Sequence, residues 1–467
     1  MLENGFECVF GQPPPNYWTL LHAKCEHPGC PGSSEERSIG LMLYGDESTA
    51  LGSTFMAFHW QSDHSELAAN SQQSRYLITV IEKERYVVRD GINVTIQGIT
   101  SHIVASLNLW REQGLQGLKA SVVVVKGDWK FIKELCNLQR FYSRDAICFL
   151  CEASKSMDCP YTDTSASAKW RDTYLKSDPW TVAPEITKLA DWSLLRVSID
   201  LMHTFHLGLG RDIIASTLLI LLRSRGLVAG SSVKERMMTV SALIKAFAKQ
   251  KQRAFPAKWC LTNQKLGLKT NKFAEFHGKA WQAGVIIQWL ASFFEATPCA
   301  DPNVVACVAL SNHLVTLMIS AREHGVHLTD VEMQQIKTVG EGFLKSYLSA
   351  HTAYRGWCPY KMYNVRPKFH MMQHLIESAD TGRNPASSMC FMDEDWIKNV
   401  MRVVQATHKK VAARNTLHRW LLGLLPALTE GKRRPASLLA LASAVLCMCS
   451  SPTGFARAVA EMQLASS

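Results

Sequence analysis

The sequence predicts an α/β protein in which a mixed β-sheet is interrupted by a large all-helical insertion. Two observations predict this fold class. Short runs rich in β-branched and aromatic residues lie in the first third of the chain. Residues 213–360 instead space their apolar side chains at helical intervals and lack the alternation of a half-buried strand. We therefore expect one sheet-containing domain whose two segments flank a bundle of helices.

The domain organisation follows from these signals. A length of 467 residues suits two or three domains in a row, but the order of strands and helices favours one split domain. We expect an irregular N-terminal segment (1–37), a first segment of the sheet domain (38–212) and a helical insertion (213–360). A second segment of the sheet domain with the third acid (361–423) and a basic, helical tail (424–467) follow.

Strands are expected at 39–44, 54–60, 75–81 and 120–125, with a helix over 96–113 before the last of them. The first three runs follow one another closely, which predicts an antiparallel meander. The fourth ends in four valines, and such a β-branched run is typical of a strand covered on both faces. Two later runs also resemble strands, residues 197–202 and, as a strand or strand-to-helix junction, 368–376.

The middle of the chain predicts a helical bundle. Helices are expected at 213–222, 233–249, 280–296, 304–324 and 329–348, and a further one over 393–411. The runs are separated by polar residues and by Gly and Pro, which punctuate helices. No repeat of fixed period connects them.

Composition excludes some classes of protein. Hydrophobic residues make up 47% and charged residues 19% of the chain, which describes a globular protein and excludes disorder over most of its length. The most apolar runs, Ile213–Leu222 and Leu438–Cys449, are shorter than the ~20 residues that cross a bilayer, so no membrane partner is expected. The N-terminus lacks a signal-peptide pattern, and we therefore interpret the fourteen cysteines as free thiols or metal ligands.

The formal charge of +11 is concentrated in two acid-free stretches, 241–272 with eight basic residues and 397–429 with six. Such clusters neutralise phosphates, although a solvated basic face without a partner has the same composition. The candidate DNA-binding residues are Lys249, Lys251, Arg253, Lys409, Lys410 and Arg414. Four neighbouring aromatic residues could stack on unpaired bases, but core packing is the simpler interpretation for Trp259, Phe273, Trp281 and Trp420.

Two predicted strands each end in a Gly-Asp step, which places Asp46 and Asp128 at strand ends. Their order is strand, strand, strand, helix, strand, which is the order of a ribonuclease-H-like domain. Adjacent central strands of that fold bring two carboxylates together to hold Mg²⁺, which prefers oxygen ligands. The alternative is that each Asp caps a turn after its strand.

The chain resembles the cut-and-paste DNA transposases of the CACTA (En/Spm-like) kind over roughly residues 38–420. The motifs that carry the resemblance follow Asp128 in order: Cys148-Phe-Leu-Cys151, Asp200-Leu-Met-His203, His370-Met-Met-Gln-His374 and Cys390-Phe-Met-Asp-Glu-Asp-Trp396. Each motif is short, and their common order supports the resemblance. A long helical region separates the last two motifs from Asp128.

The resemblance implies an RNase-H-like DDE enzyme that uses two Mg²⁺ or Mn²⁺ ions for phosphodiester hydrolysis and strand transfer. It assigns Asp46 and Asp128 as the first and second catalytic acids and Glu394 as the third. Alternative acids are Asp200, Asp393 and Asp395. An acidic first turn that favours the helix dipole explains residues 393–395 without catalysis.

The pair Cys148 and Cys151 has the spacing by which one turn offers two thiolates to a structural zinc. Cys159 and His203, or His206 in its place, are the candidates to complete four ligands. The alternative is a pair of buried thiols. We interpret His370 and His374 as structural histidines.

The expected partner is double-stranded DNA, both transposon ends and target, and the DNA substrate implies a nuclear location. The resemblance is also compatible with a homo-oligomer. A catalytically inactive relic that binds DNA or another partner is the alternative function. A nuclease of the same fold without transposition is a third.

Overall fold

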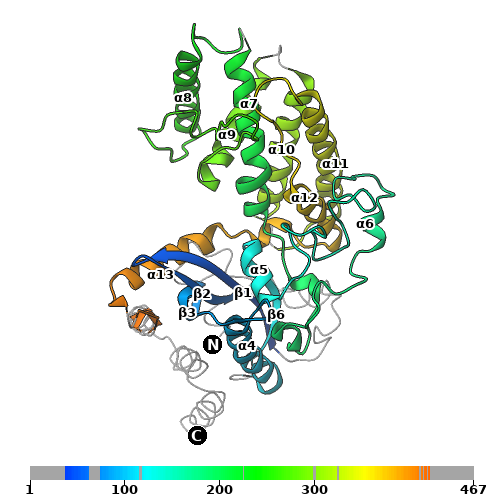
Figure 1. The fold of residues 1–467 in the computed structure, drawn as a ribbon, viewed down its shortest axis with the longest axis vertical. Coiled ribbons are helices and arrows are strands. Elements are labelled where there is room, and N and C mark those ends of the chain that lie inside the picture. Colours follow the sequence, from blue (N-terminus) through cyan, green and yellow to red (C-terminus); the bar gives the residue numbers. More distant parts are fainter. Residues whose placement is uncertain are drawn as a thin grey trace. The chain divides into compact units, whose positions relative to one another are not determined.

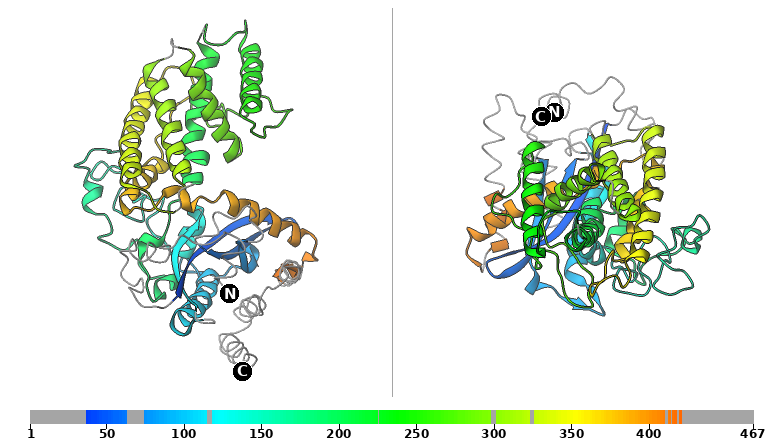
Figure 2. Two further views of the ribbon diagram at one scale, coloured as in Figure 1. Left: turned by 180° about the vertical axis from the view of Figure 1, so that it is seen from behind. Right: turned by 90° about the horizontal axis from the view of Figure 1, so that it is seen from above.

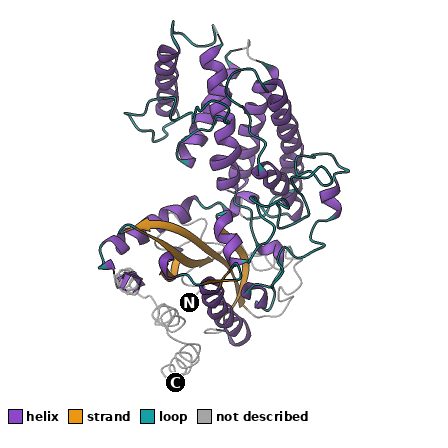
Figure 3. Cartoon of the chain, viewed as in Figure 1, coloured by secondary structure: helices purple, strands orange, loops and turns teal. Residues whose placement is uncertain are grey.

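The computed structural model describes residues 37–62, 74–114, 118–224, 226–297, 301–322, 326–409, 412–413, 415–417 and 419–420. Residues 1–36 of the predicted N-terminal segment and the whole predicted tail 424–467 lie outside these ranges. The protein is a mixed α/β chain that divides into two compact units. The described strands belong to the first unit, whereas the second consists of helices and loops (Figure 3).

The two units differ in extent from the predicted domains. The sheet unit comprises residues up to 139, residues 178–198 and residues from 390 onwards, and the helical unit comprises 140–177 and 199–389. The helical unit is therefore larger than the predicted insertion, 213–360. It includes the cysteine pair and the histidine pair, which we had assigned to the sheet domain.

The sheet of the first unit has the order β3-β2-β1-β6. Its strands are β1 (Arg37–Ala50), β2 (Ser53–Ser62), β3 (Tyr76–Glu82) and β6 (Leu118–Gly127). β1 pairs antiparallel with β2, and β2 pairs antiparallel with β3, which confirms the predicted meander. β6 joins β1 in parallel, so the sheet is mixed as predicted. A parallel pair requires a crossover, which α4 (Val94–Gln113) supplies.

The sheet is covered by a helix on each face (Figures 1 and 2). On one face, Leu41 and Leu43 of β1 border a small apolar cavity together with Ile103, Leu107 and Trp110 of α4. On the other face, α13 (Phe391–Gln405) packs on β1. Its buried residues recur three and four apart, at positions 393, 396, 397, 400, 401 and 404, which is the spacing of one helical face.

Phe131 of α5 (Trp129–Leu135) explains the glycine in each Gly-Asp step. Its ring lies across Gly45 of β1 and Gly127 of β6, which are paired in register. A Cβ added at Gly45 would lie 2.1 Å from Cε2 of Phe131, and one at Gly127 would lie 2.4 Å from Cδ1. The same ring makes an edge contact with Phe58, with centroids 5.4 Å apart. The two glycines therefore let α5 approach β1 and the end of β6 closely.

The segment 178–198 returns to the sheet beside β6. Val197 forms an isolated parallel bridge with Val125, and the Ser198 N–H donates to the Val125 carbonyl at 2.9 Å. The predicted strand over 197–202 is therefore wrong beyond this bridge. A π-helix, Met202–Leu209, follows at once, because Asp200 accepts hydrogen bonds from backbone N–H groups of the next turn.

The helices of the second unit confirm the predicted bundle of helical segments. They are α7 (Gly210–Arg223), α8 (Val233–Gln250), α9 (Ala280–Glu295), α10 (Pro302–Ala321), α11 (Asp330–Ala353) and α12 (Pro367–Ser378). The run 368–376, predicted as a strand or junction, is wholly helical in α12. A proline at the first helical position starts that helix, since its fixed φ suits the first turn.

Short elements complete the described chain. They are η2 (Lys83–Arg85), β4 (Val88–Arg89), β5 (Ile92–Asn93), α6 (Lys169–Asp172), η3 (Glu185–Lys188), η4 (Leu194–Arg196), η7 (Ala379–Thr381) and η8 (Pro385–Ser388). By length and composition alone, Met202–Arg223 and Pro302–Ala321 are apolar enough to cross a membrane. The first is 89% buried inside the protein, which is typical of a core helix.

We predict that Gly45→Ala lowers the free energy of unfolding by about 2 kcal/mol or more, because the new methyl group overlaps the Phe131 ring. Gly98→Ala is the matched control. Gly98 lies in the interior of α4 with no atom near the added Cβ, so alanine should stabilise the protein by about 0.5–1 kcal/mol. Urea unfolding of both variants measures the difference. Equal stabilities would contradict the packing of Phe131 across Gly45.

Candidate active site and metal centre

Asp46 and Asp128 belong to adjacent parallel strands, but only Asp128 follows the end of its strand. β1 continues to Ala50 and pairs Asp46 with Ala57 of β2, so the predicted position of Asp46 at a strand end is wrong. Tyr44 pairs in register with Lys126, and the next pair along the two parallel strands is Gly45 with Gly127. Side chains two residues apart on a strand point to the same face. Asp46 therefore lies on the same face of the sheet as Tyr44, the face that α13 covers. Asp128 lies two residues after Lys126, just beyond the end of β6.

Each of these aspartates already has a local partner. Asp46 accepts hydrogen bonds from the Tyr44 hydroxyl at 2.9 Å and from the Glu47 N–H at 2.7 Å. Asp128 is the N-cap of α5, and its Oδ1 accepts from the Phe131 N–H at 2.6 Å. The capping role that we gave as the alternative is therefore confirmed for Asp128, and the described bond uses one of its two carboxylate oxygens.

The three acids at the start of α13 differ in environment. Asp393 is fully buried, Glu394 is half-buried and Asp395 is exposed. Asp393 lies between two buried cations, with its Oδ1 2.7 Å from Arg75 Nε and its Oδ2 2.9 Å from Lys126 Nζ. Its oxygens are therefore both held by the sheet, which leaves Glu394 as the half-buried acid of the turn.

The buried cluster around Asp393 includes an uncharged histidine. His59 Nε2 lies 3.1 Å from Asp393 Oδ1, yet burial lowers the pKa of His59 to about 4 despite this carboxylate. Burial by itself raises the pKa of Asp393, but the charges of Lys126 and Arg75 outweigh it and hold that pKa well below the ordinary value. At neutral pH the cluster therefore consists of one carboxylate, two cations and a neutral imidazole.

Tyr44 connects this cluster to Asp46. Its pKa is raised well above the ordinary value, first by burial and then by the nearby acidic groups of Asp46, Cys390 and Asp393. Tyr44 is therefore close both to the first candidate acid and to the start of α13. In the described residues, Asp46, Asp128 and Glu394 do not form a group whose ligand atoms all lie within 4.8 Å of one another.

Asp200, an alternative acid, lies in the helical unit and not on a strand. It is buried and accepts hydrogen bonds from the N–H groups of Met202 and His203, at 3.0 Å each, and it pairs with the His203 ring. Burial raises its pKa, but the bonds from His203 and Met202 outweigh burial and lower it. These contacts give Asp200 the role of a helix cap.

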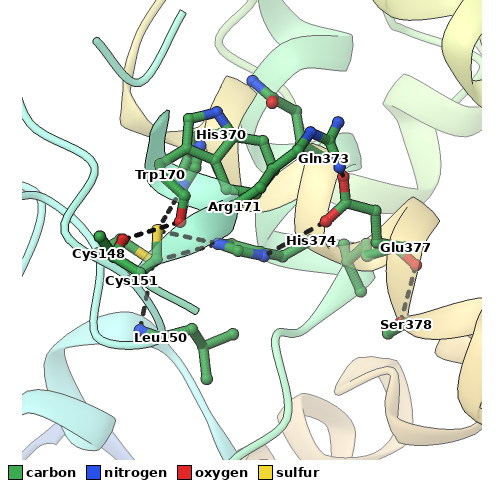
Figure 4. A network of polar contacts seen from close by, with 12 residues as sticks. Cys148, Leu150, Cys151, Trp170, Arg171, His370, Gln373, His374, Glu377 and Ser378 are labelled. Atoms are coloured by element: carbon green, nitrogen blue, oxygen red, sulfur yellow. Dashed lines mark hydrogen bonds and ion pairs between the residues drawn. The ribbon is translucent and has the colours of Figure 1, made fainter. Parts of the chain in front are cut away.

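Two cysteines of a loop and two histidines of α12 form a group that could hold a metal ion (Figure 4). Cys148 and Cys151 lie in the loop, and His370 and His374 lie four apart on one helix face. The Cys148 Sγ–His374 Nε2 distance is 3.3 Å, and Cys151 Sγ lies 3.2 Å from His370 Nε2 and 3.5 Å from His374 Nε2. All four side chains are buried.

These distances suit a tetrahedral zinc ion. Zn–S and Zn–N bonds of about 2.3 and 2.0–2.1 Å place sulfur and nitrogen ligands roughly 3.6 Å apart, close to the separations observed here. Burial lowers the pKa of His370 well below its ordinary value, so its ring is neutral, the form that binds metals. Without a metal, a hydrogen bond with Cys148 and burial hold the pKa of Cys151 well above its ordinary value.

The residues around the centre orient the histidines. The ring of Trp170 packs edge-on against both, with centroids 4.8 Å from His370 and 5.2 Å from His374. Glu377 Oε2 lies 4.0 Å from His374 Nδ1, and the carboxylate is also paired with Arg171. A carboxylate behind a histidine fixes the ring orientation at metal sites.

The ligand set differs from the predicted one. Cys148 and Cys151 are in the group as predicted, but His370 and His374 replace Cys159 and His203. The ring of His203 is paired with Asp200 instead. His206, the other candidate, is buried in the π-helix and is not a member of the group that contains Cys148 and Cys151. Sequence reasoning interpreted the histidine pair as structural, although its four-residue spacing is the signal of two ligands on one helix face.

The candidate DNA-binding cations are exposed where the structure describes them. Lys249, Lys251 and Arg253 lie at the end of α8 and just beyond it, and Lys409 follows α13. Lys410 and Arg414 lie outside the described residues.

The aromatic residues near the basic stretches divide into core and surface. Trp259 and Trp420 are buried, 5% and 7% exposed respectively, which confirms core packing for both. Phe273 is half-buried. Trp281 is 41% exposed and makes an edge contact with Phe255, so core packing is wrong for Trp281.

His59, Arg75 and Lys126 form a buried cluster with Asp393 that the sequence patterns did not predict. A lysine directly before the Gly-Asp step of an apolar strand is the available signal, since a charged residue at a covered position needs a partner. No protein-family model matches the chain, and no curated protein matches it in sequence. The geometry therefore carries the functional argument.

We predict that His59→Gln flattens the pH dependence of stability between about pH 6.5 and pH 4. The unfolded chain protonates this histidine below about pH 6.5, whereas the folded protein resists protonation down to about pH 4. The unfolded state thus binds more protons in this window, so stability falls as the pH falls, by up to about 1.4 kcal/mol per pH unit. The variant should lose the contribution of His59, whereas the buried His206 and His370, whose pKa values are also lowered by burial, should keep theirs.

Urea unfolding at a series of pH values tests this prediction. His102→Gln is the control, because His102 is an exposed histidine of α4 in the same unit. The control should retain the slope of the wild type. Parallel curves for wild type and His59→Gln would contradict a buried neutral histidine beside Asp393.

Proposed function

We propose that the protein is an RNase-H-like DNA transposase of the DDE type, which cuts and joins phosphodiester bonds with two divalent metal ions. The observation that carries the proposal is the placement of two aspartates next to glycines that are paired in register on adjacent parallel strands, with Asp46 inside β1 and Asp128 just after β6. Asp46 follows the paired Gly45 of β1, Asp128 follows the paired Gly127 of β6, and Glu394 lies in the first turn of α13.

The strand order supports the RNase-H-like assignment. An antiparallel meander of β1, β2 and β3 is followed by a helix and by β6, which pairs in parallel with β1. The bridge of Val197 to Val125 adds a parallel contact on the edge of β6 that β1 does not occupy. The long helical region before α13 fits the insertion of the CACTA-type transposases that the sequence resembles.

The acids fit a site for Mg²⁺ or Mn²⁺ in kind. Hard divalent cations prefer carboxylate oxygens, and Asp46, Asp128 and Glu394 are partly exposed, in contrast to the fully buried Asp393. When bound, two such ions activate a water or a 3′-hydroxyl and stabilise the leaving oxygen. The three side chains would hold the ions, and the buried pair of Lys126 with Asp393 would fix α13 against β6.

The basic residues supply the binding part of the proposal. Lys249, Lys251, Arg253 and Lys409 are exposed and would neutralise phosphates of double-stranded DNA. A DNA substrate implies a nuclear protein. We further propose a structural zinc ion on Cys148, Cys151, His370 and His374, which would clamp the loop 140–177 to α12.

A catalytically inactive, DNA-binding relic is the second candidate function. The observation that favours it is the separation of the three acids, whose ligand atoms do not all lie within 4.8 Å of one another in the described residues. Asp128 is also used as a helix cap, a role that keeps it in place without catalysis. Absence of cleavage together with retained DNA binding distinguishes this candidate.

We expect the wild-type protein to nick supercoiled DNA in Mg²⁺ or Mn²⁺, and Asp46→Asn, Asp128→Asn and Glu394→Gln each to reduce the rate by about 100-fold or more, because each removes a charged metal ligand. Asparagine is also a good N-cap, so Asp128→Asn preserves the start of α5. Plasmid nicking measured on a gel gives the rates.

Asp395→Asn is the matched control for this experiment, since Asp395 is exposed in the same turn of α13. It should retain the wild-type rate within about twofold. Equal nicking by wild type and Asp128→Asn would overturn the catalytic proposal. A wild type that binds DNA without cleaving it would establish the relic.

For the zinc centre we expect one zinc ion per purified chain, absent from Cys148→Ser and His370→Ala because each removes one of four ligands. Cys159→Ser and His203→Gln are the controls, and both should retain the metal. Elemental analysis by mass spectrometry measures the stoichiometry. Metal loss in His203→Gln with retention in His370→Ala would show that the ligand set is different.

A further inference from the structure

Two acid-free stretches of the chain meet on the helical unit. Residues 241–274 contain no Asp or Glu, and neither do residues 342–376. The connection between α8 and α9 lies beside the connection between α11 and α12, because Phe273 forms an isolated bridge with Lys361. Three backbone hydrogen bonds fix the contact. The Asn271 N–H donates to the Pro359 carbonyl, and Lys361 exchanges bonds with Lys272 and Ala274, all at 2.9–3.1 Å.

The joined connections carry exposed cations. Lys269, Lys272, Arg355 and Lys361 are all exposed. The nearest acid along the chain, Glu275, is engaged by Arg366 at 3.4 Å and by Arg211 at 3.9 Å. Asp301 is a second acid close to this region, beside Tyr354, whose pKa is raised first by burial and then by this carboxylate. The exposed cations outnumber it, so the local charge is positive and complements a polyanion.

Aromatic rings lie among these cations. Trp357 is 43% exposed, with its ring 5.4 Å from Tyr354, which holds it edge-on. The Arg223 guanidinium lies 5.2 Å above the Tyr360 ring, and Lys361 Nζ lies 5.8 Å above the Phe273 ring. An exposed tryptophan costs free energy in water, and a planar partner that stacks on it removes that cost.

We propose that this surface, the Trp357 surface, binds unpaired nucleotides of a single-stranded nucleic acid. It consists of Lys269, Lys272, Arg355, Trp357, Tyr360 and Lys361. Alternating cations and aromatic rings match the phosphates and bases of a single strand, whereas the bases of a duplex are stacked inside and expose no face to Trp357. The backbone hydrogen bonds between the two connections keep the aromatic rings in place before a ligand binds.

The inference deepens the proposed action on DNA but does not rest on the metal chemistry. Binding is measured with the full-length chain carrying Asp128→Asn and without added Mg²⁺, so cleavage does not interfere. The probes are a fluorescent oligo(dT) strand, the same strand in a duplex with oligo(dA), and a poly-glutamate peptide. Fluorescence anisotropy gives each dissociation constant.

We expect Trp357→Ala to weaken oligo(dT) binding about tenfold or more and to change duplex binding less than twofold, because stacking requires an open base. Trp357→Phe should restore most of the affinity. Tyr142→Ala is the matched control, since Tyr142 is another exposed aromatic of the same unit, and it should bind as the parent does. Lys361→Glu should reduce the slope of log affinity against log salt by about 0.7 for each phosphate that the protein no longer neutralises.

Several results overturn the proposal. Unchanged oligo(dT) binding by Trp357→Ala excludes stacking, and an equal weakening of duplex binding excludes single-strand selectivity. Tighter binding of poly-glutamate than of oligo(dT) assigns the surface to an acidic protein. Thermal melts of each variant separate a defect in binding from a defect in folding. If the wild type never cleaves DNA but Trp357-dependent binding persists, the catalytic proposal fails and this inference stands.

Discussion

The ion cluster at Asp393 joins the sheet to the helix that carries the third candidate acid. His59 comes from β2, Lys126 comes from β6, and Arg75 directly precedes β3, so one carboxylate of α13 contacts three parts of the sheet. Buried charges are tolerated only when they are paired, and removing one partner typically costs about 3–5 kcal/mol because the others stay buried. The position of α13, and with it Glu394, therefore depends on this cluster.

The helical unit depends on a second group of buried polar side chains. The loop 140–177 has little regular secondary structure, and its contacts with α12 include the cysteines at 148 and 151 and a hydrogen bond from Gln373 to the Tyr161 carbonyl at 3.0 Å. The loop also buries apolar side chains of its own, among them Ile147, Leu150 and Trp170. A metal held by two loop cysteines and two helix histidines would add a further constraint, because metal binding supplies folding free energy directly.

The two units carry different parts of the proposed chemistry. The candidate catalytic acids belong to the sheet unit, where parallel pairing sets the register of Asp46 and Asp128 and the glycine before each of them admits Phe131. Most of the described exposed cations considered for DNA, and the Trp357 surface, belong to the helical unit. In the proposed function, such a division would let the sheet remain rigid at the acids while loops of the helical unit contact the substrate.

The sequence by itself determined the kinds of element and their order, because strand and helix periodicities are local properties. The strands, the helix before β6 and the helices of the bundle all occur where periodicity predicted them, and the cysteine spacing correctly marked two members of the candidate metal centre. Periodicity failed at 197–202 and 368–376, where a capping Asp200 and a starting Pro367 decide in favour of helix. Only the tertiary structure brought His370 and His374 to cysteines more than 200 residues away, and only it distinguished the buried Asp393 from Glu394. Ligand sets and buried ion pairs depend on distances across the fold, which no local pattern encodes.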